Sequence, residues 1–447
     1  MNGHGRLTFP KIEEHGREYY EGNFSNGMRS GQGKLFWKDG SKYDGDFEND
    51  NFNGIGIKTY SKEDKIDFYE GDWNNGKKSG KGKLIFKDES KYEGEFKNDK
   101  FNGSGIYKHS KEHEIDVYKG YWKDDKKSGE GLLFYKDGTK YDGDFENGHF
   151  VRFGIMTYSK ESTEDFYEGG WKDDKKSGKG KLIYKNGTKF AGDFENDKFS
   201  GFGIWTYSKE DQKEIYEGHW KDNKKSGKGK LIWKNGDKYE GNFENDKFNG
   251  LGVFNFSKAD QRDVYDGLWK DDTKSGNGKL LFKNGSKYEG ECENDRANGF
   301  GVFTFTKKDQ RDFYEGHWKD DKKSGKGKLI WKNGDKYEGD FENDKINGFG
   351  VCTCSKENPK KYYEGNWKDG LSSGKGKLVW KDGVNFNGYF KNGQFNGTGV
   401  YIYHKEDRRK FYAGDWKDGK KSGKGKLVWK DGKINEGLFK DGNFIGG

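Results

Sequence analysis

Proline, cysteine and long hydrophobic runs are all scarce in this sequence. The 447 residues include 2 prolines and 3 cysteines, and three cysteines are too few for a disulfide framework. No apolar run approaches the roughly 18 residues that cross a membrane, and the N-terminus lacks the hydrophobic core of a signal peptide. These absences predict a soluble, cytoplasmic protein.

An excess of one charge is also missing. Lysine and arginine total 85 and aspartate and glutamate total 77, which leaves a formal net charge of +8. Because the two signs nearly balance, no general attraction for polyanions follows. We therefore expect no nucleic-acid partner.

Hydrophobic residues are few, at 29%, and the mean hydropathy of −1.29 is typical of a disordered chain. Aromatic residues nevertheless make up 17%, beside 72 glycines, and disordered chains avoid aromatics. No spacing of 3.6 residues recurs, and the frequent glycines disfavour helix. This combination predicts thin β structure with one buried face.

A Y-x-G tripeptide recurs along the whole sequence, and its spacing alternates between 23 and 26 residues, so the unit is a 49-residue pair. Such regularity is typical of repeat architectures. We expect tandem repeats over residues 20–434. Residues 1–19 then form an N-terminal half-repeat with a charged, cap-like segment at 10–18, and residues 435–447 form a C-terminal half-repeat. No stretch is left over for a separate catalytic domain.

Each repeat has the alternation of a β-hairpin. In "GKGKLIW" (227–233) and "YEGNF" (239–243), glycines alternate with large side chains on one face, and "KNGD" (234–237) supplies Asn-Gly, which predicts a two-residue turn. A ring can lie over a neighbouring glycine on this face, while Glu or Asp of one strand faces Lys of the next on the other. The structural residues expected on the aromatic face are Tyr239, Gly241, Phe243, Gly227, Gly229 and Trp233.

The segment "YEGDWNNGKKSGKGKLIF" (69–86) and its copies resemble the MORN repeat (membrane occupation and recognition nexus). The resemblance spans essentially the whole chain. It implies an all-β fold: an elongated, single-layer, twisted antiparallel sheet, a solenoid-like ribbon of tandem hairpins. Thirty-six strands at ~4.8 Å each would extend for roughly 170 Å.

Motifs for chemistry are absent. "SGKGK" lacks the G-x-x-x-x-G-K-[ST] spacing of a phosphate loop, and the carboxylates lie on a charged face with nothing apolar to raise a pKa. Cys352 and Cys354 have no further ligands at zinc spacing, and Cys292 takes the place of a core phenylalanine. We expect no catalytic residue, no metal and no cofactor, and hence no enzyme.

Every second hairpin is followed by a connection three residues longer than "KNGDK", as in "SKEDKIDF" (61–68) and "TKKDQRDF" (306–313). These long loops should share one edge of the sheet. Their mixed charge suits specific protein partners, although duplication of the 49-residue unit alone would also produce them. The candidate protein-binding residues are Lys62, Glu63, Asp64, Lys209, Glu210, Asp211, Lys307, Lys308, Asp309 and Arg311.

The opposite edge carries the recurrent "KKSGKGK", which could meet anionic lipid headgroups at about 1 kcal/mol per lysine. Neighbouring "KDD" and "END" segments offer a simpler role, as partners that neutralise these lysines. The candidate lipid-binding residues are Lys77, Lys78, Lys81, Lys83, Lys175, Lys176, Lys224 and Lys225.

The resemblance implies two functions. One is a structural scaffold that places partner proteins along a cytoskeletal or ciliary (axonemal) assembly. The alternative is a peripheral module that binds phosphoinositides or other anionic lipids, or tethers a membrane. The unpaired strands at the two ends also predict a homo-oligomer through the terminal repeats. Finally, Arg152 occupies a slot that holds glycine in the other complete repeats, which predicts a local bulge, kink or contact point.

Overall fold

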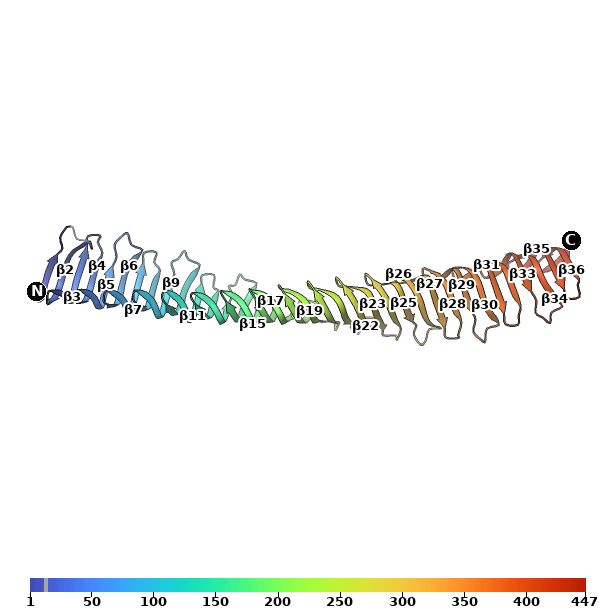
Figure 1. The fold of residues 1–447 in the computed structure, drawn as a ribbon, viewed down its shortest axis with the longest axis horizontal. Coiled ribbons are helices and arrows are strands. Elements are labelled where there is room, and N and C mark those ends of the chain that lie inside the picture. Colours follow the sequence, from blue (N-terminus) through green and yellow to red (C-terminus); the bar gives the residue numbers. More distant parts are fainter. Residues whose placement is uncertain (12–14) are drawn as a thin grey trace. The chain divides into compact units, whose positions relative to one another are not determined.

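The computed structural model describes residues 1–11 and 15–447, so part of the cap-like segment 10–18 lies outside the described residues. The described residues form 37 β-strands and no helix (Figure 1). Each strand runs antiparallel to its neighbours, and the sheet is open. The predicted all-β fold of tandem hairpins is confirmed. The chain divides into two units, residues 1–224 and 225–447.

The strands of the first unit alternate between Y-x-G strands and G-x-G strands. They are β1 (Gly3–Thr8), β2 (Arg17–Ser25), β3 (Met28–Trp37), β4 (Lys42–Glu48), β5 (Asn51–Thr59), β6 (Ile66–Asn74), β7 (Lys77–Phe86), β8 (Lys91–Lys97), β9 (Lys100–Lys108), β10 (Ile115–Lys123), β11 (Lys126–Tyr135), β12 (Lys140–Glu146), β13 (His149–Thr157), β14 (Glu164–Lys172), β15 (Lys175–Tyr184), β16 (Lys189–Glu195), β17 (Lys198–Thr206) and β18 (Lys213–Lys221).

The second unit continues the same alternation from β19, whose first residue ends the first unit. Its strands are β19 (Lys224–Trp233), β20 (Lys238–Glu244), β21 (Lys247–Asn255), β22 (Arg262–Lys270), β23 (Thr273–Phe282), β24 (Lys287–Glu293), β25 (Arg296–Thr304), β26 (Arg311–Lys319), β27 (Lys322–Trp331), β28 (Lys336–Glu342), β29 (Lys345–Thr353), β30 (Lys360–Lys368), β31 (Leu371–Trp380), β32 (Asn385–Lys391), β33 (Gln394–Ile402), β34 (Arg409–Lys417), β35 (Lys420–Trp429), β36 (Ile434–Lys440) and β37 (Asn443–Gly446).

One edge of each unit is closed by two-residue turns. In the β4–β5 hairpin Asn49 and Asp50 have φ of 48° and 65°, so both central residues are left-handed. That conformation is the type I′ turn, which matches the twist of the flanking strands and favours Asn, Asp and Gly. The recurrent "END" and "KDD" segments therefore mark the tight turns.

The predicted two-residue turn at "KNGD" is wrong. Gly236 N–H donates to Trp233 O at 2.9 Å, Trp233 N–H donates to Asp237 O at 3.0 Å, and Gly236 has φ of 93°. This geometry is a three-residue loop, a type I turn followed by a left-handed glycine. Asn235 instead uses its side-chain oxygen, which accepts a hydrogen bond from Asp237 N–H at 2.9 Å.

The predicted stacking of rings over glycines is confirmed. Tyr239 is fully buried, and its hydroxyl donates to Asn242 O at 3.0 Å, so the ring lies flat along its own strand. A Cβ on Gly241 would lie 2.6 Å from the Tyr239 hydroxyl and 2.5 Å from the Cα of Gly252 on the next strand. The ring therefore needs a glycine beneath it on both strands.

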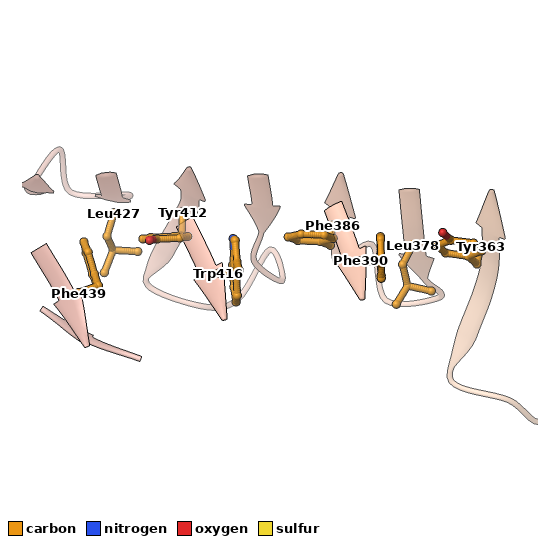
Figure 2. Packing of buried hydrophobic residues seen from close by; sticks show 8 residues of the cluster. All are labelled: Tyr363, Leu378, Phe386, Phe390, Tyr412, Trp416, Leu427 and Phe439. Atoms are coloured by element: carbon orange, nitrogen blue, oxygen red, sulfur yellow. The ribbon is translucent and has the colours of Figure 1, made fainter. Parts of the chain in front are cut away.

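A second class of glycine bends the strands. Gly250 and Gly276 have φ of 79° and 73° and lie beside register shifts between neighbouring strands. Bulges of this kind bend a strand and increase its twist. Figure 2 shows the result in the second unit: Tyr363, Leu378, Phe386, Phe390, Tyr412, Trp416, Leu427 and Phe439 lie in a row between two rows of strand segments. Bending lets one layer of sheet bury its own aromatic face.

Arg152 adopts the left-handed conformation of the glycines it replaces. Its φ is 55°, and the equivalent Gly201 and Gly250 have φ of 58° and 79°. The register shift beside it, between Gly143 and Asp144, recurs beside Gly201, so the bulge belongs to every repeat and is not created by the arginine. What Arg152 adds is strain, because side chains with a Cβ disfavour this region.

Candidate functional site

The long loops share one backbone conformation. In the loop between β25 and β26, Phe305 N–H donates to Asp312 O at 2.9 Å and Asp309 N–H donates to Thr306 O at 3.1 Å. The same pair of bonds recurs in the loops that begin at Tyr60, His109, Tyr158, Tyr207, Phe256, Cys354 and Tyr403. Within each unit these loops lie on one edge, opposite the two-residue turns (Figure 1).

A lysine from the next short turn braces seven of these long loops. Lys332 Nζ donates to three carbonyl oxygens of one loop, those of Thr306 (2.7 Å), Lys307 (2.8 Å) and Asp309 (2.6 Å). Equivalent bonds to loop carbonyls are made by Lys87, Lys136, Lys185, Lys283, Lys381 and Lys430. A charged donor that satisfies several carbonyls at once holds the loop in one shape. The loops are thus built elements.

Asp309 and Arg311, two of the predicted partner-binding residues, are engaged within their own loop. The guanidinium makes two bonds to the carboxylate, at 3.0 and 2.8 Å, and lies 4.0 Å from the centre of the Phe305 ring. The side-chain bonds from Arg311 hold the pKa of Asp309 down at about 2. The same arrangement recurs at Asp260–Arg262 and Asp407–Arg409.

Two further carboxylates shape their loops as well. Asp64 accepts bonds from Ser61 N–H at 3.0 Å and Ser61 Oγ at 2.8 Å, and Asp211 accepts from Lys213 N–H at 2.9 Å. The other candidate residues are exposed at the loop tips: Lys62, Glu63, Lys209, Glu210, Lys307 and Lys308. Each loop therefore presents a short, mixed-charge tip on a braced base.

The lysine-rich edge is only partly accessible. Lys78, Lys176 and Lys225 are 9%, 8% and 9% exposed and lie on the aromatic face, so they cannot reach a lipid headgroup in this fold. Lys176 pairs with Glu164 at 2.9 Å and sits 5.4 Å from the Tyr167 ring. Burial lowers the pKa of Lys78. The other predicted lipid-binding lysines are exposed or half-buried: Lys77, Lys81, Lys83, Lys175 and Lys224.

Sequence reasoning missed a row of exposed apolar side chains on the charged face. In "NGFG" and its copies, the side chain of the residue just before the final glycine lies on this charged face and is exposed to solvent. Its exposed fraction is 53% at Phe153 and 44% at Phe202 in the first unit, and 64% at Leu251, 47% at Phe300 and 49% at Phe349 in the second. The signal was present as an apolar residue in a strand position that alternation assigns to solvent.

Neither a group of metal ligands nor a membrane-spanning helix is found in the part of the chain that the structure describes. No three His, Cys, Asp or Glu side chains there are grouped as metal ligands, and no helix there has the length and apolar character needed to cross a bilayer. Cys292 is buried, and burial raises the pKa of the Cys352 thiol to about 12. The histidines that approach each other are His109 and His113, whose rings stack at 4.3 Å.

Two solved structures have some likeness to this chain, at low sequence identity and low TM-score. The TCP domain of SAS-4 (dCPAP) from Drosophila melanogaster, solved with a proline-rich motif of Ana2 (dSTIL), has 13% identity and a TM-score of 0.16, covering 36% of this chain and 77% of its own. The TCP10 domain of CPAP from Danio rerio (E1021V mutant) has 10% identity and a TM-score of 0.15, covering 69% of this chain and 99% of its own. TM-scores this low do not indicate a shared overall fold.

No curated protein matches the chain. The MORN repeat, in contrast, matches seventeen segments: residues 20–42, 43–65, 69–91, 92–111, 118–140, 141–163, 167–189, 190–212, 216–238, 239–260, 265–287, 288–310, 314–336, 337–358, 363–384, 386–408 and 412–434. The segment that starts at Asn435, where the aromatic residue is replaced, is not among them. With most of its length in these segments and a hairpin in each, the chain belongs to the MORN repeat family.

Proposed function

We propose that this protein is a non-enzymatic scaffold that binds partner proteins through its long loops in a large cytoskeletal or ciliary assembly. The observation that carries the proposal is the braced, shared conformation of the loops. Lys332 and its equivalents fix the loop carbonyls, while residues such as Lys307 and Lys308 stay exposed at the tip. An insertion that was merely tolerated would need no such support.

Repetition makes weak contacts useful. Within a unit the loops recur every four strands on one edge, so a partner with matching spacing can engage several of them at once. Linked weak contacts raise the overall affinity strongly when the geometry permits simultaneous binding. Mixed charge at each tip favours specific, salt-sensitive pairing over indiscriminate attachment. The cytoskeletal or ciliary setting is proposed from the family alone, and end-to-end self-association stays a prediction.

The test is to replace three successive eight-residue connections of the second unit, residues 257–264, 306–313 and 355–362, with the five-residue "KNGDK" turn. That turn is native to the sequence, so the hairpins should still form. We expect recovery of partners by the tagged protein to fall at least tenfold and its cellular position to change. A matched control replaces one "KNGDK" turn (234–238) with the "KDGSK" turn (38–42). Equal recovery by the shortened protein and the control would contradict the proposal.

The second candidate function, binding to anionic membranes, is favoured by the exposed apolar row. Phe153 and Phe202 could enter the headgroup region while exposed lysines of the same unit, such as Lys81 and Lys179, contact lipid phosphates. Sedimentation with vesicles that contain or lack anionic lipid, at low and high salt, tests this function. If vesicle binding requires anionic lipid and is lost when Phe153 and Phe202 are replaced, the result would favour membrane binding over the binding of partner proteins by the long loops.

A further inference from the structure

One repeat of the second unit lacks two rings of the aromatic core. In six of its sister repeats, the buried tyrosine or phenylalanine is followed four residues later by a phenylalanine that pairs with a second phenylalanine on the next strand. These pairs are Phe47–Phe52, Phe96–Phe101, Phe145–Phe150, Phe194–Phe199, Phe243–Phe248 and Phe390–Phe395. The second position after Tyr337 holds Ile346. After Tyr288 the same two positions hold Cys292 and Ala297, which are direct partners across β24 and β25.

The walls that hold these rings elsewhere keep their geometry here. In the sister repeat, Phe248 stacks on Tyr239 with centroids 3.7 Å apart and meets Trp269 edge-on at 5.4 Å. Tyr239 and Trp269 are themselves 5.5 Å apart with an interplanar angle of 88°. The equivalent Tyr288 and Trp318 are 5.5 Å apart at 85°. The cradle for a phenyl ring is therefore intact, and the ring is missing.

The missing rings leave an accessible cavity, which we call the ring pocket. Its volume is about 490 Å³, and its apolar lining includes Tyr265, Leu280, Tyr288, Phe303 and Trp318. Small-molecule and side-chain sites typically measure about 300–1,000 Å³. The pocket reaches solvent, because Tyr288 is 4% exposed where its sister tyrosines are 0%. An apolar cavity left by a missing side chain can accept an aromatic ring.

The charges at the rim are already compensated. Lys274 pairs with Asp295 at 3.6 Å, and Lys323 pairs with Asp344 at 3.0 Å. Asp321 accepts a hydrogen bond from Ala297 N–H at 2.7 Å. Arg262, the remaining charged residue of the lining, pairs with Asp260 at 2.6 Å, so each of these charged side chains already has a partner. The preferred occupant is an uncharged ring.

We propose that the ring pocket binds one phenylalanine side chain of a partner polypeptide. The sister repeats show which group satisfies these walls: phenylalanines held on adjacent strands, with the Phe243 and Phe248 rings 5.4 Å apart. A peptide laid along the aromatic face would supply the same group from outside. That the ring comes from a partner polypeptide rests on the proposed scaffold function, whereas the preference of the pocket for a phenyl ring rests on its lining alone.

The experiment measures binding of acetyl-Gly-Phe-Gly-amide to the full chain by isothermal titration, beside acetyl-Gly-Ala-Gly-amide and free toluene. The matched variant carries Cys292→Phe and Ala297→Phe, which restores the residues of the sister repeats. It should fold, with a higher thermal midpoint, and its affinity for the Phe peptide should fall at least tenfold. The reciprocal variant, Phe243→Cys with Phe248→Ala, should gain a second binding site.

Three results would overturn the proposal. Equal affinity for the Phe and Ala peptides would mean that the walls do not select a ring. Unchanged binding after the refill would place the site elsewhere. Binding of toluene without the Phe peptide would leave a ring pocket but remove the polypeptide as its occupant. All of these measurements use a chain with its long loops intact, so a failure here is distinct from a failure of the loop-shortening test.

Discussion

At the scale of single residues, glycine performs two separate tasks in each repeat. Gly241 and Gly252 leave room for the Tyr239 ring, whereas Gly250 and Gly276 adopt the left-handed backbone of a bulge. The first task excludes a Cβ for lack of space, and the second disfavours it through backbone strain. The two kinds of position therefore respond differently to substitution.

Replacing Gly252 by alanine should destabilise its repeat by about 2 kcal/mol, because overpacking of a filled core forces neighbours apart. The added Cβ would lie 2.5 Å from Cζ of Tyr239. Gly5→Ala is the control, since its Cβ would meet nothing closer than 3.7 Å. Urea denaturation measures both, and an equal effect at the two positions would refute the packing explanation.

Arg152→Gly should stabilise the first unit by about 1 kcal/mol, since it removes a non-glycine residue from the left-handed region. The reverse change, Gly201→Arg, places the same strain in the next 49-residue unit, where φ is 58°. It should lower stability by a similar or larger amount, because a Cβ there would also lie 2.8 Å from Asp193. Unfolding midpoints that move in the opposite sense would contradict this assignment of strain.

His109 should make the first unit sensitive to acid. Burial, together with the nearby His113, lowers the pKa of His109 from 6.5 to about 4. Because the unfolded chain takes up this proton first, the site's stability is intact above pH 6.5 and is lost as pH falls through about 4. His109→Tyr restores the residue found at Tyr60 and Tyr158. It should lose less stability than the parent between pH 7 and 4.5, and parallel losses would show that His109 contributes nothing.

At the scale of elements, the braced long loop is the unit that the proposed function depends on. Lys332→Met should leave the strands paired but speed amide exchange in residues 305–310, because three carbonyl contacts are lost. Lys336→Met, a change at an exposed strand position on the same hairpin, is the control. Exchange rates in the loop that match the control would mean that the lysine does not brace it.

Much of the fold could be predicted from the sequence. The spacing of Y-x-G indicated where the hairpins lie, and the alternation of residues along the strand indicated that the Tyr239 ring lies over a glycine. The type of turn at 234–237 could not be predicted, because Asn-Gly is compatible with both a two-residue turn and a three-residue loop. The burial of Lys225 was open to prediction, since it has the same strand parity as Leu231. The brace from Lys332 joins residues about 25 positions apart, and the sequence offers no local signal for it.

At the scale of the whole molecule, repetition limits where function can arise. In a chain of seventeen matched MORN repeats, a binding site can arise in two kinds of place. One is a surface that the repeats share, namely the loop edge or the exposed apolar row. The other is one of the few positions where a single repeat differs from the others. The ring pocket at Cys292 and Ala297 is such a departure. Under the proposed scaffold function, specificity depends on which of these surfaces a partner can span.

The central claim is that the long-loop edge contacts the partner, and a footprint of the partner-bound protein tests it most directly. Hydrogen–deuterium exchange should show protection concentrated in several successive loops, such as 256–261, 305–310 and 354–359. Little change should appear in the two-residue turns of the opposite edge, such as 294–295 and 343–344. Protection confined to those turns, or to the row that includes Phe300 and Phe349, would contradict the account.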